Sequence, residues 1–159
     1  MDGNLVVVVA GVWYHRSYFR FAKALSKLLS RLPKDKIVLA SGDGEGTDYL
    51  VFLFALRYGI RHIAVKPDEL EGKAAIYRMH EDMLREAAYL IVAHDGFSKT
   101  VAAAAAKAKE KRIPVRIITV NRKNEYGFSE QKKVNGRYRS LDVRTLSRYR
   151  QRHFDKKLS

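Results

Sequence analysis

Apolar and polar residues follow two alternating patterns along the first 120 positions. One pattern is a short, continuous apolar run rich in β-branched residues, typical of a strand buried on both faces of a parallel sheet. These runs occupy residues 5–10, 37–40, 62–65, 89–93 and 114–120. The other pattern places apolar residues three and four positions apart, which predicts helices. It covers residues 17–33, 46–58, 74–88 and 101–111.

Strand and helix patterns therefore alternate about five times. This order predicts a doubly wound α/β fold, with a five-stranded parallel sheet and helices on both faces. In such sheets ligands bind outside the carboxyl ends of the strands, near the point where the strand order reverses. We expect three loops at that edge, which are residues 11–17, 41–48 and 94–100.

Three local signals refine the helix boundaries. Ser17 is a residue type that caps helices, so we expect it to cap the first one. Gly59 follows the second helix and is predicted to end it. After the third strand, Pro67 opens a polar stretch that we expect to be a loop as far as Gly72.

The composition changes after Val120, which predicts a core domain over residues 1–120 and a basic extension over 121–159. The chain has 31 Lys/Arg and 17 Asp/Glu, a net charge of +14, and the extension contributes 12 basic and 4 acidic residues. Such an excess favours a polyanionic partner, either nucleic acid or an acidic protein. We expect a linker and then a short arginine-rich helix that Ser140 caps.

The extension interleaves arginines with aromatic residues, a combination that pairs phosphates and stacks on unpaired bases. Its candidate nucleic-acid-binding residues are Arg137, Arg139, Arg144, Arg148, Arg150 and Arg152. The alternative is that Leu141, Leu146 and Tyr149 dock the helix on the core and leave the arginines as its solvated face.

Several chemistries are not expected from this sequence. The chain has no cysteine, which excludes disulfides and thiolate metal sites. His15 and His80 have no partner at metal-ligand spacing, so we predict neither a metal nor a cofactor. The N-terminal apolar run is short and has no basic segment before it, which favours a first strand over a signal peptide. No apolar run is long enough to span a bilayer, and these features together suit a cytoplasmic protein.

The stretch SGDGEGTDYL, residues 41–50, has three glycines in five positions between a strand and a helix. Glycines let backbone approach a ligand, and the following helix offers N–H groups to an anion. The spacing is neither that of dinucleotide folds nor that of P-loops, and no lysine lies in the turn. Asp43 and Glu45 would repel a phosphate, whereas carboxylates suit sugar hydroxyls or exocyclic amines.

The longer stretch SGDGEGTDYLVFLFALRYGIRHIAV resembles the S-G-G-A-x-G-A-D…A…G-I signature of the SLOG superfamily, and most closely its YspA-like branch. GKAA at 72–75 with Met83, HDGFSKT at 94–100 and KAKEKRIPV fit further segments of that branch in register. The resemblance covers about residues 4–120. It implies a Rossmann-like domain that binds a nucleotide or a nucleotide-derived ligand at the three loops.

The resemblance and the loop positions together give the candidate ligand-binding residues. They are Gly11, Trp13, Ser41, Gly42, Gly44, Gly46, Asp48, Lys73, Asp95, Gly96, Ser98 and Thr100. Asp48 would bind a ribose or orient the glycine turn, or would simply favour the helix dipole. Ser98 and Thr100 suit either helix capping or phosphate binding. Trp13 would either stack on a base or pack in the core.

Departures from the family pattern argue against catalysis. The branch has G-S-R after its first strand, whereas this chain has Gly11-Val12-Trp13. Where the branch has Arg-Asn, this chain has Met79-His80. LOG-type enzymes carry a glutamate after the threonine turn, but residues 101–106 read Val-Ala-Ala-Ala-Ala-Ala. LOG-like hydrolysis is therefore not expected.

Three functions remain open from the sequence. The preferred one is non-catalytic sensing or sequestration of a nucleotide or nucleotide-derived ligand, a role that the resemblance sets among phage–host conflict systems. The second is a nucleoside N-glycosidase or deoxyribosyltransferase, which needs a carboxylate near the anomeric carbon. Its candidates are Glu45, Asp48, Glu81 and Asp95. The third is RNA or DNA binding with the core as scaffold. A homodimer is compatible with each of them.

Overall fold

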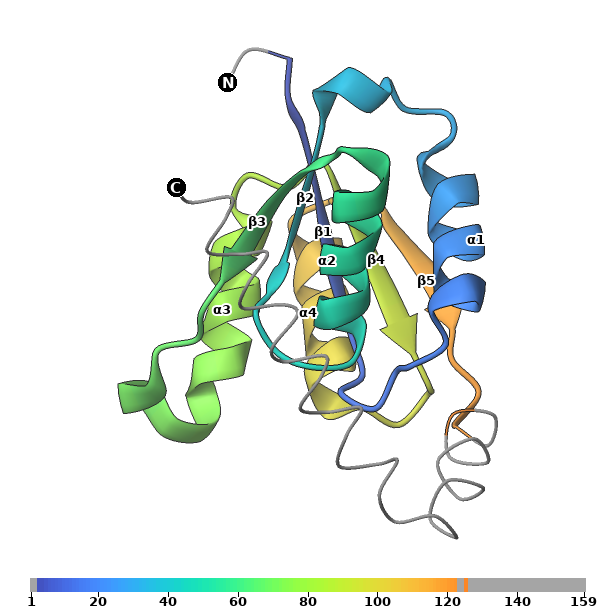
Figure 1. The fold of residues 1–159 in the computed structure, drawn as a ribbon. Coiled ribbons are helices and arrows are strands. Elements are labelled where there is room, and N and C mark those ends of the chain that lie inside the picture. The colour runs from blue at the N-terminus through green and yellow to red at the C-terminus, as the bar shows by residue number, and fades with distance from the viewer. Residues whose placement is uncertain (1–2, 123–124, 126–159) are drawn as a thin grey trace, which may run out of the picture. The chain divides into compact units, whose positions relative to one another are not determined.

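The computed structural model describes residues 3–122 and 125. Within them, five strands form one parallel sheet in the spatial order β3-β2-β1-β4-β5 (Figure 1). The strands are β1 (Leu5–Gly11), β2 (Ile37–Gly42), β3 (Arg61–Val65), β4 (Tyr89–His94) and β5 (Val115–Thr119). The doubly wound α/β fold predicted from the apolar runs is confirmed, because every pair of neighbouring strands is parallel.

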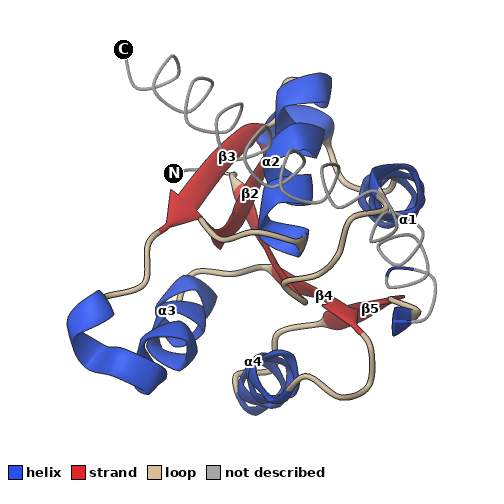
Figure 2. Cartoon of the chain, turned by 60° about the horizontal axis from the view of Figure 1, so that its bottom comes forward, coloured by secondary structure: helices blue, strands red, loops and turns tan. Residues whose placement is uncertain are grey.

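Helices cover both faces of this sheet, as Figure 2 shows. One face is covered by α1 (Tyr18–Leu29) and α2 (Thr47–Tyr58), and the other by α3 (Ala75–Leu84) and α4 (Lys99–Glu110). Two short 3₁₀ helices, η1 (Lys34–Lys36) and η2 (Glu69–Ala74), complete the described elements. One loop joins the carboxyl end of a strand to each of α1, α2 and α4, whereas η2 stands between β3 and α3.

The hydrophobic core lies on the two central strands. Val7, Val9, Leu90 and Val92 are completely buried, because helices cover β1 and β4 from both sides. Burying such a side chain stabilises the fold by roughly 1.5–3 kcal/mol. This burial on two faces is the physical reason that the central strands read as continuous apolar runs.

Three boundary predictions were wrong because tertiary structure overrides local pattern. The first helix ends at Leu29 rather than near Pro33, because the chain turns there and Leu32 N donates to Leu29 O at 3.0 Å. The third helix ends at Leu84 rather than Ala88, because the backbone N–H of Ala88 donates to Val6 O at 2.8 Å as the chain enters β4. The stretch that begins after Pro67 is not a loop throughout but forms η2, where the Asp68 side chain accepts from Leu70 N at 3.0 Å.

The two predicted helix ends differ in outcome. Ser17 occupies the position before α1, but its side chain makes no capping hydrogen bond. Gly59 ends α2 in the left-handed conformation, with φ +64°, and its N–H donates to Ala55 O, as predicted.

The chain divides after Val120 into two units, residues 1–120 and 121–159. The predicted helix after Ser140 and the six candidate arginines from Arg137 to Arg152 lie outside the described residues. In the described part of the chain, no helix has the length and apolar character needed to cross a membrane.

Candidate ligand site at the carboxyl edge of the sheet

The strand order reverses between β1 and β4, which are hydrogen-bonded neighbours with Gly11 opposite Ala93. From β1 the chain continues to β2 and β3 on one side, whereas β4 and β5 lie on the other. Three loops leave this carboxyl edge next to one another. We call them the β1 loop (residues 12–17), the β2 loop (43–46) and the β4 loop (95–98).

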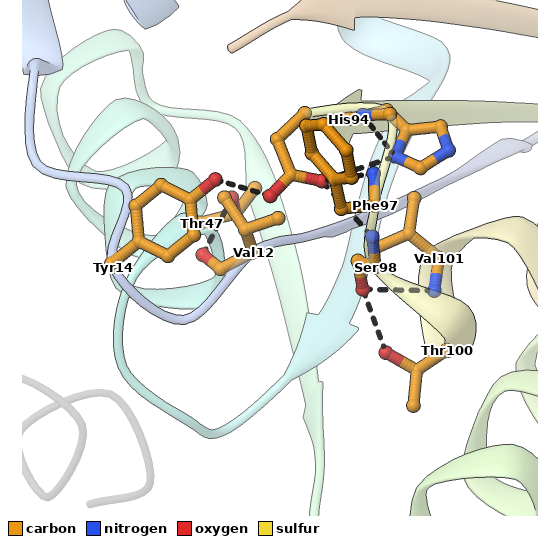
Figure 3. Close-up of polar contacts among 10 residues, drawn as sticks. Val12, Tyr14, Thr47, His94, Phe97, Ser98, Thr100 and Val101 are labelled. Atoms are coloured by element: carbon orange, nitrogen blue, oxygen red, sulfur yellow. Dashed lines mark hydrogen bonds and ion pairs between the residues drawn. The ribbon is translucent and has the colours of Figure 1, made fainter. Parts of the chain in front are cut away.

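A buried threonine fastens the β1 loop to the start of α2. Thr47 is fully buried, and both its backbone N–H and its hydroxyl donate to Val12 O, at 3.1 and 3.3 Å (Figure 3). The Nδ1 atom of His15 lies 2.9 Å from Thr47 Oγ1. Because the hydroxyl proton goes to Val12, Oγ1 accepts from His15, which places the imidazole hydrogen on Nδ1.

Two of the candidate glycines make this close approach possible. A Cβ on Gly11 would collide with the Thr47 side chain, and a Cβ on Gly46 would collide with the backbone of Val12 and Trp13. Gly46 also has φ +71°, a conformation that side chains disfavour. These two glycines therefore serve the packing of one loop on another.

The glycine turn is held by its own aspartate. Asp48 lies in the first turn of α2, and its Oδ2 accepts a hydrogen bond from Gly44 N at 3.2 Å. A Cβ on Gly42 would lie only 2.5 Å from the same oxygen. The carboxylate thus sits against the turn where a phosphate would have to bind. This geometry fits the alternative in which Asp48 orients the glycine turn.

Two other sequence candidates lie apart from the loops. Ser41 is completely buried at the end of β2, where its Oγ lies 2.8 Å from His62 Nε2 on β3. Lys73 is exposed on η2, and no hydrogen bond or ion pair between described residues links it to the other candidates. The structure does not bring either side chain to the switch point.

Asp95 is the residue that joins the β1 and β4 loops. Its Oδ2 accepts from the Tyr14 hydroxyl at 2.5 Å, and its Oδ1 accepts from Phe97 N at 2.8 Å and Ser98 N at 3.0 Å (Figure 3). The side chain is only 5% exposed. Burial alone would raise the pKa of Asp95, but these three hydrogen bonds, with one from its own backbone N–H, outweigh burial and hold the pKa below its usual value. The carboxylate is therefore ionised at neutral pH.

The start of α4 is suited to an anion. Ser98 caps this helix, since its Oγ accepts from Val101 N at 3.4 Å, and it lies 3.2 Å from Thr100 Oγ1. Whichever hydroxyl donates to the other, one hydroxyl proton of the pair remains for a ligand oxygen. The first turn has no acidic residue and includes the exposed Lys99. The Asp95 carboxylate already accepts from Ser98 N just before the helix, so the groups left to bind an anion are Lys99 and the remaining hydroxyl proton.

Large aromatic side chains flank the Tyr14–Asp95 hydrogen bond on both loops. Trp13 is 63% exposed and Phe97 is 75% exposed. Trp13 packs edge-on against Tyr14, with ring centroids 5.7 Å apart. Trp13 therefore does not pack in the core, and the switch point presents two exposed aromatic surfaces on a tied pair of loops.

The four candidate catalytic carboxylates do not converge. Asp48 and Asp95 are both engaged in hydrogen bonds that hold their own loops. Glu81 pairs with Lys107 at 3.7 Å, between the later turns of α3 and α4 and away from the carboxyl edge. Glu45 is exposed in the β2 loop. No two of these groups form an acid–base pair in the described structure.

Sequence reasoning missed Tyr14, Thr47 and Phe97. Each stands next to a residue that was singled out, namely Trp13, Gly46 and Gly96. Their roles depend on contacts between segments far apart in the chain, since Tyr14 and Asp95 are 81 positions apart. No local pattern carries that information.

Comparison with protein-family models and with curated proteins found no match to this chain. The doubly wound fold hosts many unrelated functions, so the function has to be argued from the residues at the carboxyl edge.

The close packing at Gly46 predicts a large cost for a side chain there. Gly46→Ala should lower the free energy of unfolding by about 3 kcal/mol or more, because it adds a backbone collision to the strain of positive φ. Gly59→Ala is the matched control, since φ is also positive but no atom lies within 4 Å of the added Cβ. It should cost about 1 kcal/mol. Equal losses in urea unfolding would contradict this assignment.

Stability should fall as the pH drops from 7.5 to 4.5. Burial lowers the pKa of both His15 and His80 to about 4, below their unfolded value of 6.5. The unfolded chain therefore binds protons first, and each histidine removes about 2–3 kcal/mol across this range. The stability that the two neutral histidines contribute is fully present above pH 6.5 and is lost as the pH falls toward 4.

Urea unfolding at several pH values measures this loss. His80→Leu should retain stability at pH 7.5, because the buried Nδ1 of His80 has no hydrogen-bond partner in the described structure, and should remove one histidine's share of the acid sensitivity. A loss that stays the same in the variant would show that His80 is not buried in its neutral form.

Proposed function

We propose that the carboxyl edge of the sheet binds a nucleotide or nucleotide-derived ligand and does not transform it. The observation that carries the proposal is the pair of exposed aromatic residues, Trp13 and Phe97, on two loops tied together by the ionised Asp95. Both loops lie at the switch point, where doubly wound sheets bind ligands.

Exposed aromatic rings at this place need a physical reason. An aromatic side chain left in water does not gain the favourable free energy of burial, and exposed apolar surface often marks a ligand-binding site. A nucleobase offers a flat face on which such rings stack. The Tyr14–Asp95 hydrogen bond fixes the two loops beforehand, so that less ordering entropy is lost when a base binds.

The start of α4 supplies the complementary site for a phosphate. Lys99 and one hydroxyl proton of the Ser98–Thr100 pair favour an anion there. The glycine turn is a poorer phosphate site, because Asp48 already occupies it. We therefore assign the base to the aromatic pair and the phosphate to α4.

The absence of catalysis is part of the same proposal. The residues after Thr100 include no acid as far as Ala106, and Asp48 and Asp95 hold loops instead of facing one another. The domain would sense or sequester its ligand as a member of the SLOG superfamily in the cytoplasm. The basic residues of 121–159 would contact nucleic acid or an acidic partner.

Trp13 is the only tryptophan, so its fluorescence reports on the site directly. Titration with nucleoside mono-, di- and triphosphates, cyclic nucleotides and dinucleotides should quench it for at least one compound. Phe97→Ala should weaken binding of that compound about fivefold or more, since base stacking contributes roughly 1–3 kcal/mol per base. Ile117→Ala removes an exposed apolar side chain from β5 and should leave the affinity unchanged.

Three results would contradict parts of the proposal. Fluorescence that no compound alters would remove the ligand from the switch point. If chromatography detects free base released from the bound compound, the glycosidase alternative is restored. A nucleoside that binds as tightly as its phosphate would remove α4 from the site.

A further inference from the structure

The positive charge of the core is concentrated in its first segment. Residues 3–34 contain six basic residues and no Asp or Glu, whereas residues 35–120 contain 13 Lys/Arg and 12 Asp/Glu. The six are Arg16, Arg20, Lys23, Lys27, Arg31 and Lys34. The net charge of the core thus comes almost wholly from α1 and the residues that flank it.

Helical spacing aligns these charges on the outer side of α1. Arg20, Lys23 and Lys27 stand at i, i+3 and i+7 and are all exposed, and we call them the α1 basic face. Phe21 and Leu25 lie on the opposite side of the helix and are buried. At 1.5 Å per residue, the face extends over about 10 Å of the helix.

The α1 basic face lies on a helix that contains no acidic residue, whereas α2, α3 and α4 each contain at least one. On α3 and α4, Arg85 pairs with Asp82, and Lys107 pairs with Glu81 and Glu110. No ion pair of the described residues involves Arg20, Lys23 or Lys27. Surfaces of soluble domains usually mix both signs, so a patch of one sign indicates an anionic partner.

An exposed aromatic ring lies beside these cations. Phe19 is 82% exposed in the first turn of α1 and is the i−4 neighbour of Lys23. Cations beside an exposed ring are the arrangement by which proteins bind single-stranded nucleic acid, with phosphates on the cations and a base on the ring. A membrane would need the apolar side of the helix, which is buried in the core.

We propose that the α1 basic face and Phe19 form a binding surface for single-stranded nucleic acid on the core domain itself. The surface is separate from the nucleotide site, which uses Trp13 and Phe97. It is also separate from residues 121–159, because every residue it needs lies within the core.

The test compares full-length proteins by fluorescence anisotropy with labelled dT20, U20 and a 20-bp duplex at several salt concentrations. The triple variant Arg20→Gln, Lys23→Gln, Lys27→Gln should bind at least one single strand about tenfold or more weakly near 0.1 M salt. Its log–log salt slope should fall by about 2, because each lost phosphate contact removes about 0.7. Circular dichroism checks that each variant is folded.

A matched variant removes the same charge elsewhere. Lys109→Gln, Lys111→Gln, Arg112→Gln changes three exposed residues at the end of α4, on the other face of the sheet. Equal losses in the two triple variants would overturn the proposal, because net charge alone would then explain them. The wild-type protein and both triple variants keep residues 121–159, so any binding by that segment is the same in all three proteins.

Phe19→Ala separates stacking from charge. It should weaken single-strand binding about fivefold while the salt slope stays constant, and Tyr77→Ala, an exposed aromatic change on α3, should have no effect. The assignment would be overturned if the duplex bound as tightly as the single strands. It would also be overturned if the triple variant at α1 lost binding only to phosphatidylserine vesicles or to polyglutamate, measured in parallel, and kept its binding to single strands. If no nucleotide alters the Trp13 fluorescence but the α1 triple variant still loses single-strand binding, the proposed nucleotide site is rejected and the α1 surface is retained.

Discussion

The carboxyl edge of the sheet depends on the hydrogen bonds that Thr47 makes to Val12 O. A single buried carbonyl accepts from both the backbone and the hydroxyl of Thr47, and His15 completes the arrangement. Losing one such buried partner costs roughly 1–3 kcal/mol, since the remaining group stays unsatisfied. The interaction is possible only because Gly11 and Gly46 have no side chain at the contact. It fixes where the β1 loop leaves the sheet.

That position determines what the β1 loop presents. With Val12 hydrogen-bonded to Thr47, the Tyr14 hydroxyl donates to Asp95 on the β4 loop. Trp13 on the β1 loop and Phe97 on the β4 loop both remain exposed to solvent. The glycine-rich stretch is therefore a structural support for the proposed ligand site, with Asp48 binding its turn. The proposed ligand surface lies between β1 and β4, and the proposed phosphate site lies at the start of α4. The α1 basic face extends from the same loop along the outside of the domain.

Most of the fold could be predicted from the sequence, because burial on both faces gives each central strand a continuous apolar run. Parallel topology then brings the three loops to one edge. The partners within that edge could not be predicted. Asp48 accepts from the backbone of Gly44, which is one of several possible partners in the turn, and the Tyr14–Asp95 bond joins residues 81 positions apart. The early end of α3 follows from the hydrogen bond of Ala88 to Val6 O, which no local pattern contains.

The most direct measurement is mass spectrometry of the small molecules that the purified, high-salt-washed protein releases on denaturation. The wild-type protein and the Trp13→Ala, Phe97→Ala double variant are compared at equal protein concentration. A site between β1 and β4 predicts one nucleotide-like compound from the wild-type protein and much less of it from the variant. The same compound in equal amount from both proteins, or oligonucleotides alone, would contradict a nucleotide site at the switch point.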